Sequence, residues 1–234
     1  MQAEDVEAIR SLSLFSEAQD STFAALIDAS YLQRFPPGVT LIEQGAPADF
    51  IYVVLDGLVE MFATGAGRKT TIALLRPLSA FILAAVLSDQ AHLQSARTLR
   101  DSQILLIPAK KLREAMAGDV AFMRAIVAEL ARTYRATVRD LKNQKLRSGP
   151  ERLGAWLLRF HEALGGVDEF TLDVDKRTLA ARLGMTPESL SRGFAALRSH
   201  GVASHGARIA IQREALSSFV QPDPMLDERE GSVW

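Results

Sequence analysis

Apolar and polar positions along this chain change their period, and each period predicts a different kind of element. Between residues 31 and about 108, β-branched and other apolar residues gather in short runs that glycine or proline interrupts. Short runs at regular spacing are typical of strands in a jelly roll or barrel. The predicted strand segments are VTLIEQG (39–45), DFIYVVLDGLVEMFA (49–63), RKTTIALL (68–75) and SQILLIP (102–108).

A helical period follows in residues 109–147, which contain no proline and many helix-forming residues. Apolar positions recur there at alternating spacings of three and four, which predicts a seam of about three heptads. The seam consists of Val120, Met123, Val127, Leu130, Tyr134, Thr137 and Leu141. A second copy of the chain could cover this stripe in a homodimer, or the stripe could pack on the chain's own strand region. The length of the helix favours the homodimer.

The pattern changes again at the segment RSGP, residues 147–150, which predicts a hinge. Beyond it, residues 175–199 predict two short helices, with Asp175 as the N-cap of the first and Gly184 at its end. Thr186 can cap the second helix, with a proline in its first turn. Two helices joined by a tight glycine turn form a helix-turn-helix.

The second of these helices has two different faces. On a helical wheel, Leu190, Phe194 and Leu197 form an apolar side, while Glu188, Ser191 and Arg192 share the opposite side. Recognition helices place residues near their N-terminus against base edges in the major groove. Arginine can bind guanine there, a carboxylate can accept from cytosine, and serine is permissive. Alternatively, Glu188 only favours the helix N-terminus and Arg192 pairs with it.

A hairpin follows the two helices. Residues 202–211, VASHGARIAI, predict two strands around a Ser-His-Gly turn, which would make the module a winged helix-turn-helix. Side chains of the wing and of the helix starts would lie beside the DNA, mostly at phosphates. The additional candidates for DNA contact are Thr186, Ser189, Thr178, Lys176, Arg177, His205 and Arg208.

Composition and charge limit the kinds of partner and site that the chain can have. Residues 132–213 hold 15 lysines and arginines against 8 acidic residues (+7), while the remainder holds 12 against 20 (−8), for a net charge of −1. A basic block indicates a polyanion partner or a solvated surface.

The chain has no cysteine, which excludes disulfides, thiolate metal sites and cysteine-held iron–sulfur clusters. We expect a cytoplasmic protein without a signal peptide or membrane span. No nucleophile elbow, phosphate-binding glycine loop or metal-spaced cluster indicates an enzyme.

The order of these regions resembles the CRP/FNR family of bacterial transcription regulators, from about residue 12 to 220. The stretches that carry the resemblance are FPPGVTLIEQGAPADFIYVVLDGLVEMF, QSARTLRDSQILLIP and LAARLGMTPESLSRGFAALRSHGVASHGARIAI. It implies an α+β chain with a cyclic-nucleotide-binding-like β-roll (double-stranded β-helix) as sensor domain with N-terminal helices (1–108). A dimerisation helix (109–147), a winged helix-turn-helix domain (148–220) and a disordered tail (221–234) would follow.

The motif Glu188, Ser191, Arg192 matches the FNR-type recognition pattern. This implies a palindromic DNA site of the form TTGA…TCAA and recruitment of RNA polymerase.

The resemblance also bears on the effector. Cyclic-nucleotide members carry a Gly-Glu pair and an Arg-Ser-Ala motif, and here we match those positions to Leu83-Ala84 and to residues 94–96, Gln-Ser-Ala. Both charged groups are missing, which argues against cyclic AMP, unless Arg97 supplies a positive charge through a slipped register.

The apolar segment LLRPLSAFILAAVLSDQAHLQSART resembles instead the nitrogen-oxide-responsive DNR/NNR/NnrR-type branch, regulators of denitrification thought to sense nitric oxide through haem. On that resemblance, His92 is the candidate haem ligand near the pocket. The effector pocket would be lined by Phe81, Ile82, Leu83, Val86 and Leu87, with Met123 and Val127 of the long helix opposite. Plain core packing of these residues, with another small effector or none, is the alternative.

Overall fold

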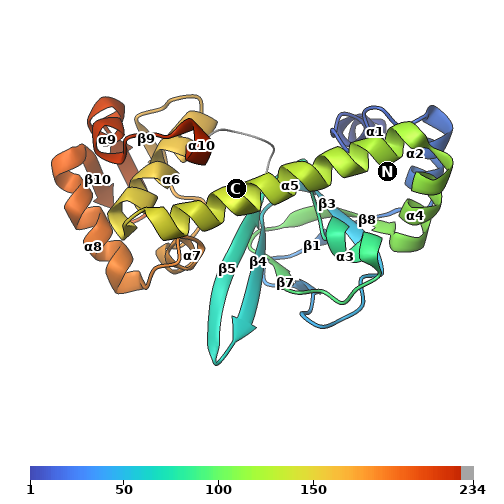
Figure 1. The fold of residues 1–234 in the computed structure, drawn as a ribbon, viewed down its shortest axis with the longest axis horizontal. Helices are drawn as coiled ribbons and strands as arrows, with labels where there is room; N and C mark the ends of the chain where they lie inside the picture. Colours follow the sequence, from blue (N-terminus) through green and yellow to red (C-terminus); the bar gives the residue numbers. More distant parts are fainter. Residues whose placement is uncertain (228–234) are drawn as a thin grey trace. The chain divides into compact units, whose positions relative to one another are not determined.

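The structure, a computed structural model, describes residues 1–227 and divides them into two compact units (Figure 1). The first unit comprises Met1–Tyr134, and the second begins at Arg135. The long helix α5 (Val120–Leu146) contributes residues to both units. Among the described residues, none of the helices is long and apolar enough to cross a membrane.

Two four-stranded antiparallel sheets form a roll in the first unit, with the strand orders β1-β8-β3-β6 and β2-β7-β4-β5. Alternating apolar residues of both sheets, among them Val59, Phe81 and Ile104, bury their side chains in a common core. The expected β-roll is therefore confirmed. The strands are β1 (Tyr31–Phe35), β2 (Thr40–Ile42), β3 (Phe50–Asp56), β4 (Val59–Gly65), β5 (Arg68–Leu75), β6 (Ser79–Phe81), β7 (Ser95–Thr98) and β8 (Ser102–Pro108).

One glycine turn in the roll has a clear steric cause. Gly57 joins β3 to β4 with a φ of +99°, a conformation that side chains disfavour. A Cβ atom at this position would also collide with the backbone and hydroxyl of Ser102. Only glycine therefore fits where the β3–β4 turn crosses the start of β8.

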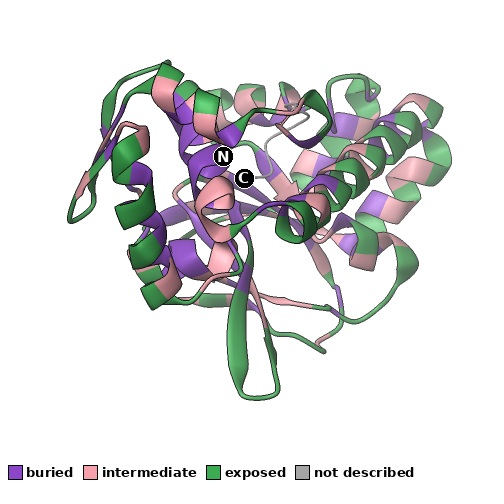
Figure 2. Cartoon of the chain, turned by 60° about the vertical axis from the view of Figure 1, so that its left-hand side comes forward, coloured by how far each residue is buried: buried purple, intermediate pink, exposed green. Residues whose placement is uncertain are grey.

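A second apolar core lies between one sheet and the helices of the first unit. Helices α1 (Ala3–Arg10), α2 (Asp20–Asp28), α3 (Leu83–Ser88) and α4 (Ala109–Gly118) contribute to it, together with the start of α5. Phe122 of α5 is fully buried and its ring stacks on Phe15 at 5.9 Å between centroids. Figure 2 marks in purple the buried residues on the helices and strands of the chain.

The segment expected as one helix over residues 109–147 is two helices, α4 and α5. Asp119 leaves the helical conformation, with φ −130° and ψ 103°. Its carboxylate accepts hydrogen bonds from the backbone N–H of Phe122 at 3.0 Å and of Gln19 at 2.8 Å, which lower the pKa of Asp119. The buried aspartate thus starts a new helix and ties it to the N-terminal helices.

The second unit is a winged helix-turn-helix, as expected. A three-stranded antiparallel sheet, in the order β10-β11-β9, forms the wing. Its strands are β9 (Glu169–Thr171), β10 (Val202–His205) and β11 (Arg208–Ile211). The helices are α6 (Gly149–Ala163), α7 (Lys176–Arg182), α8 (Pro187–Leu197), the 3₁₀ turn η1 (Arg198–His200), α9 (Arg213–Val220) and α10 (Pro224–Asp227).

The expectation of a disordered tail over residues 221–234 is wrong for residues 221–227. Pro224–Asp227 form α10, where Leu226 is buried and the Asp227 carboxylate binds two arginines. Apolar burial and ion pairing therefore offset the ordering cost of a segment whose composition is polar. Residues 228–234 lie outside the described part of the chain.

Candidate functional site

The helix-turn-helix forms through the capping residues that the sequence predicts. The Asp175 carboxylate accepts from the backbone N–H of Thr178 at 2.6 Å at the start of α7. Gly184 follows α7 with a φ of +64°, and Thr186 Oγ1 accepts from the N–H of Ser189 at 3.2 Å at the start of α8. Local hydrogen bonds thus set where both helices begin, and Gly184 permits the tight turn between them.

The two faces of α8 are those expected. Leu190, Phe194 and Leu197 are buried, whereas Glu188, Ser191 and Arg192 are exposed near the N-terminal end of the helix. Arg192 Nη2 donates to Ser189 Oγ at 3.0 Å, so a neighbouring hydroxyl orients the guanidinium. Hydrogen bonds from its own backbone N–H and from Thr186 lower the pKa of Glu188, and the charge of Arg192 adds to this effect. An acid, a hydroxyl and a guanidinium therefore share one accessible surface.

The other predicted contact residues divide into exposed and buried ones. Arg177, His205 and Arg208 are exposed, and Arg208 Nε lies 3.3 Å from Glu169 Oε1 in the neighbouring strand of the wing. Lys176 places its ammonium 5.0 Å from the ring centroid of Phe194. Thr178 differs from the expectation: it is only 8 % exposed, because it faces the core of the module rather than its surface.

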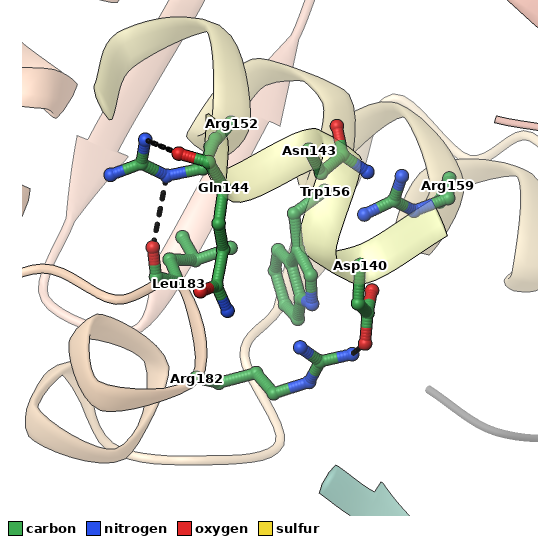
Figure 3. A pocket seen from close by; sticks show the side chains of 8 residues that line it. All are labelled: Asp140, Asn143, Gln144, Arg152, Trp156, Arg159, Arg182 and Leu183. Carbon is green, nitrogen blue, oxygen red and sulfur yellow. Dashed lines mark hydrogen bonds and ion pairs between the residues drawn. The ribbon is translucent and has the colours of Figure 1, made fainter. Parts of the chain in front are cut away.

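A small pocket behind the helix-turn-helix shows how the last turns of α5 are attached to it (Figure 3). Arg182, at the end of α7, donates to Asp140 of α5 at 2.7 Å. Arg152 of α6 donates through Nε to the carbonyl of Leu183 at 3.0 Å and through Nη1 to that of Arg147 at 2.7 Å. The pocket has a volume of about 20 Å³, room for a water molecule but not for an organic effector.

The predicted seam of α5 is largely exposed in the single chain. Leu130 is half-buried, and the other six seam residues are exposed; Val127 is 58 % and Tyr134 70 % exposed. The heptad pattern does not predict the face of α5 next to the seam, where Phe122 and Ile126 are fully buried in the first unit. Met123 and Val127, which are also predicted to line an effector pocket, are exposed in the single chain.

The apolar segment around α3 is part of the core. Phe81, Leu83 and Val86 are buried, while Ile82 and Leu87 are partly buried against the same clusters. Ile82 has a φ of +71° at the N-cap of α3, a conformation that normally needs glycine. The start of α3 is therefore apolar, because Ile82 and Leu83 both pack against the core of the first unit.

Arg97 does not supply a positive charge to the interior of the roll. Its neighbour Ala96 is part of the apolar core between the sheets, so Arg97 lies on the other face of β7. There its Nε donates to the buried carboxylate of Glu60 at 2.7 Å. The slipped register that could have supplied a phosphate ligand is thus not formed.

His92 is buried in the loop between α3 and β7. Its backbone exchanges hydrogen bonds with the loop that follows β2, at 2.8 Å to Gly45 and 2.9 Å to Ala46. The ring Nδ1 is buried and has no hydrogen-bond partner within residues 1–227. Burial lowers the pKa of His92, with Asp49 acting weakly in the opposite direction. The ring is therefore favoured in its neutral form, the form that binds metals.

Comparisons with known proteins match both units. The cyclic nucleotide-binding domain family matches residues 32–119, and the Crp-like helix-turn-helix domain family matches residues 151–219. The chain is 24 % identical over 200 residues to the CRP-like cAMP-activated global transcriptional regulator of Mycobacterium tuberculosis, covering 83 % of this chain and 89 % of that protein.

Two solved structures share the fold. FixK2 from Bradyrhizobium japonicum superposes with a TM-score of 0.72 at 21 % identity, covering 86 % of this chain and 99 % of that one. DNR from Pseudomonas aeruginosa gives a TM-score of 0.53 at 21 % identity, covering 94 % and 99 %.

Proposed function

Because the chain belongs to the CRP/FNR family of DNA-binding transcription regulators, we propose that it acts as a homodimer on palindromic promoter sites. Two copies joined along α5 would carry two copies of α8, each facing one half of the palindrome. The exposed apolar seam of α5 supports this assembly, since it lies in water in the single chain.

The observation that carries the proposal is the exposed group of Glu188, Ser191 and Arg192 at the start of α8. Their resemblance to the FNR-type pattern supports half-sites of the form TTGA and TCAA. Arg192 would donate to guanine O6 and N7, and Glu188 would accept from cytosine N4. Arg177 is exposed in the first turn of α7, and His205 is exposed on the wing. Both would contact phosphates and fix the position of the module on the DNA.

The test is a titration of labelled TTGA…TCAA duplex with wild-type protein and with Arg192→Ala. The substitution removes a base contact, so we expect a loss of about 1–3 kcal/mol on the palindrome and weaker discrimination against altered half-sites. Arg213→Ala, which removes an exposed arginine from α9, is the matched control. Undiminished preference for the palindrome in Arg192→Ala would contradict the assigned contact.

The finer proposal concerns the signal, which we infer to be nitric oxide or a related nitrogen oxide, sensed through haem and coupled to denitrification genes. The apolar segment around α3 and the unpartnered Nδ1 of His92 support it. In the arrangement described here these residues fit no haem, because Phe81, Leu83 and Val86 fill the core.

Reconstitution with haem decides this part of the proposal. A Soret band that shifts when nitric oxide is added, and that changes in His92→Ala, would support it. A spectrum no different from that of free haem would leave the roll with another small effector or none. A separate proposal is that the dimer recruits RNA polymerase. Run-off transcription from a promoter that carries the palindrome tests it.

A further inference from the structure

The connection between α5 and α6 consists of only two residues, and one of them is held by an unusual set of contacts. Arg147 is 8 % exposed although it carries a charge. Its Nη1 donates to the side chain of Asn143 in the last turns of α5, at 2.8 Å. Both of its terminal nitrogens bind Asp227, Nη1 to Oδ1 at 2.8 Å and Nη2 to Oδ2 at 2.6 Å. A paired, two-point contact of this kind fixes direction as well as distance.

The carboxylate of Asp227 belongs to α10, far along the chain, and it binds three groups. Besides Arg147 it binds Arg159 of α6, through Nη1 at 3.1 Å, and it accepts from the backbone N–H of Asp223 at 2.9 Å. Burial acts to raise its pKa, but the hydrogen bonds from Arg147 and Asp223 and the two guanidinium charges outweigh burial and lower it. The Asp227 clamp, defined as Asp227, Arg147, Arg159 and Asn143, therefore ties α5, the linker, α6 and α10 together.

We propose that Asp227 is a positioning residue for DNA recognition, which locks the angle between the end of α5 and the winged helix-turn-helix. This inference rests on the proposed palindrome-binding dimer. A palindrome requires both copies of α8 at one separation, whereas a half-site requires only one copy. If the linker were free, that separation would have to be fixed during binding, and fixing the backbone of a single residue costs about a factor of ten in affinity.

A simpler reading is that the clamp only stabilises the fold of the second unit. The Arg182–Asp140 pair already joins α5 to α7 in that unit, so stability alone does not require a second tie. The clamp differs because it binds the side chain of the linker residue itself. The two readings predict different DNA-binding behaviour: a positioning role acts on the palindrome alone, and a structural role acts equally on palindrome and half-site.

The experiment compares the full-length wild type with Asp227→Asn, and uses Glu214→Gln as a control that removes one exposed carboxylate from α9. Hydrogen–deuterium exchange without DNA reports on the backbone of residues 147–149. Titrations with a TTGA…TCAA duplex and with a single-half-site duplex report on recognition. Asp227→Glu, which keeps the charge but changes the two-point geometry, serves if Asp227→Asn does not fold.

We expect faster exchange at the linker in the Asp227 variants, a loss of palindrome affinity of about tenfold, and unchanged half-site affinity. Unchanged exchange, or equal losses on both duplexes, would overturn the positioning role. A wild type that prefers no palindrome would overturn the proposed function instead, and the exchange at residues 147–149 would then decide alone whether the clamp fixes the linker.

Discussion

Glu60 provides the sharpest stability test, because its buried carboxylate accepts hydrogen bonds from three identified side chains. The carboxylate is 1 % exposed and accepts from Thr71 Oγ1 at 2.6 Å, Arg97 Nε at 2.7 Å and Lys69 Nζ at 3.0 Å. Burial opposes ionisation of Glu60, but these hydrogen bonds and the charge of Arg97 outweigh burial and lower its pKa. Glu60→Gln keeps the size of the side chain and removes the charge.

The expected loss follows from these contacts. A hydrogen bond to a charged group contributes about 1.5–3 kcal/mol, and Glu60→Gln removes the charge from the acceptor of all three bonds. The side chains of Lys69 and Arg97 are 35 % and 39 % exposed, so solvent screens both ion pairs and lowers their contribution. We therefore expect Glu60→Gln to lower the free energy of unfolding by about 2 kcal/mol near neutral pH.

The difference in stability between wild type and Glu60→Gln should depend on pH. A carboxyl group with a lowered pKa in the folded state stabilises the protein above its unfolded-state pKa. That contribution disappears as the pH falls through the folded-state value, so the difference between wild type and Glu60→Gln should shrink below the ordinary value of 4.5.

Urea denaturation from neutral to acidic pH measures this difference, with the exposed Glu43→Gln as a control that should change stability by less than about 0.5 kcal/mol. A Glu60→Gln variant as stable as the wild type at neutral pH, or a difference that does not depend on pH, would refute the reasoning.

Two further predictions concern α5. Phe122→Ala removes a fully buried ring that stacks on Phe15, so its free energy of unfolding should fall by about 3–5 kcal/mol in denaturant titrations; a change below about 1 kcal/mol would argue against that packing. Val127→Glu places a charge in the exposed seam and should shift sedimentation-velocity profiles from dimer to monomer without altering the fold. Lys142→Glu, outside the seam, should stay dimeric, and a Val127→Glu variant that remains fully dimeric would remove the seam from the interface.

The fold was predictable where local signals and periodicity agree. The strands from Phe50 to Leu75 and the caps Asp175 and Thr186 could be assigned from residue type and spacing alone. The two faces of α8 could be predicted because its buried residues recur at the spacing of three and four that is typical of a helix.

The remaining features depend on contacts between residues distant in the chain. Asp119 ends α4 because it caps α5 and binds Gln19. Gly118 and the capping carboxylate of Asp119 are local signals of this break, but the contact with Gln19 is not visible in the sequence. Residues 221–227 are polar in composition, yet Arg147 and Arg159 hold Asp227 in place. Arg97 could be assigned to Glu60 only once the pairing of β4 with β7 was known.

Two copies of α8, joined through α5 in the proposed dimer, would read an inverted repeat, and selection of bound sites from random double-stranded DNA measures this property. We expect the wild type to enrich an inverted repeat of TTGA-like half-sites and Arg192→Ala to lose that enrichment. Enrichment of a single unrepeated site, or no enrichment above the starting pool, would contradict it.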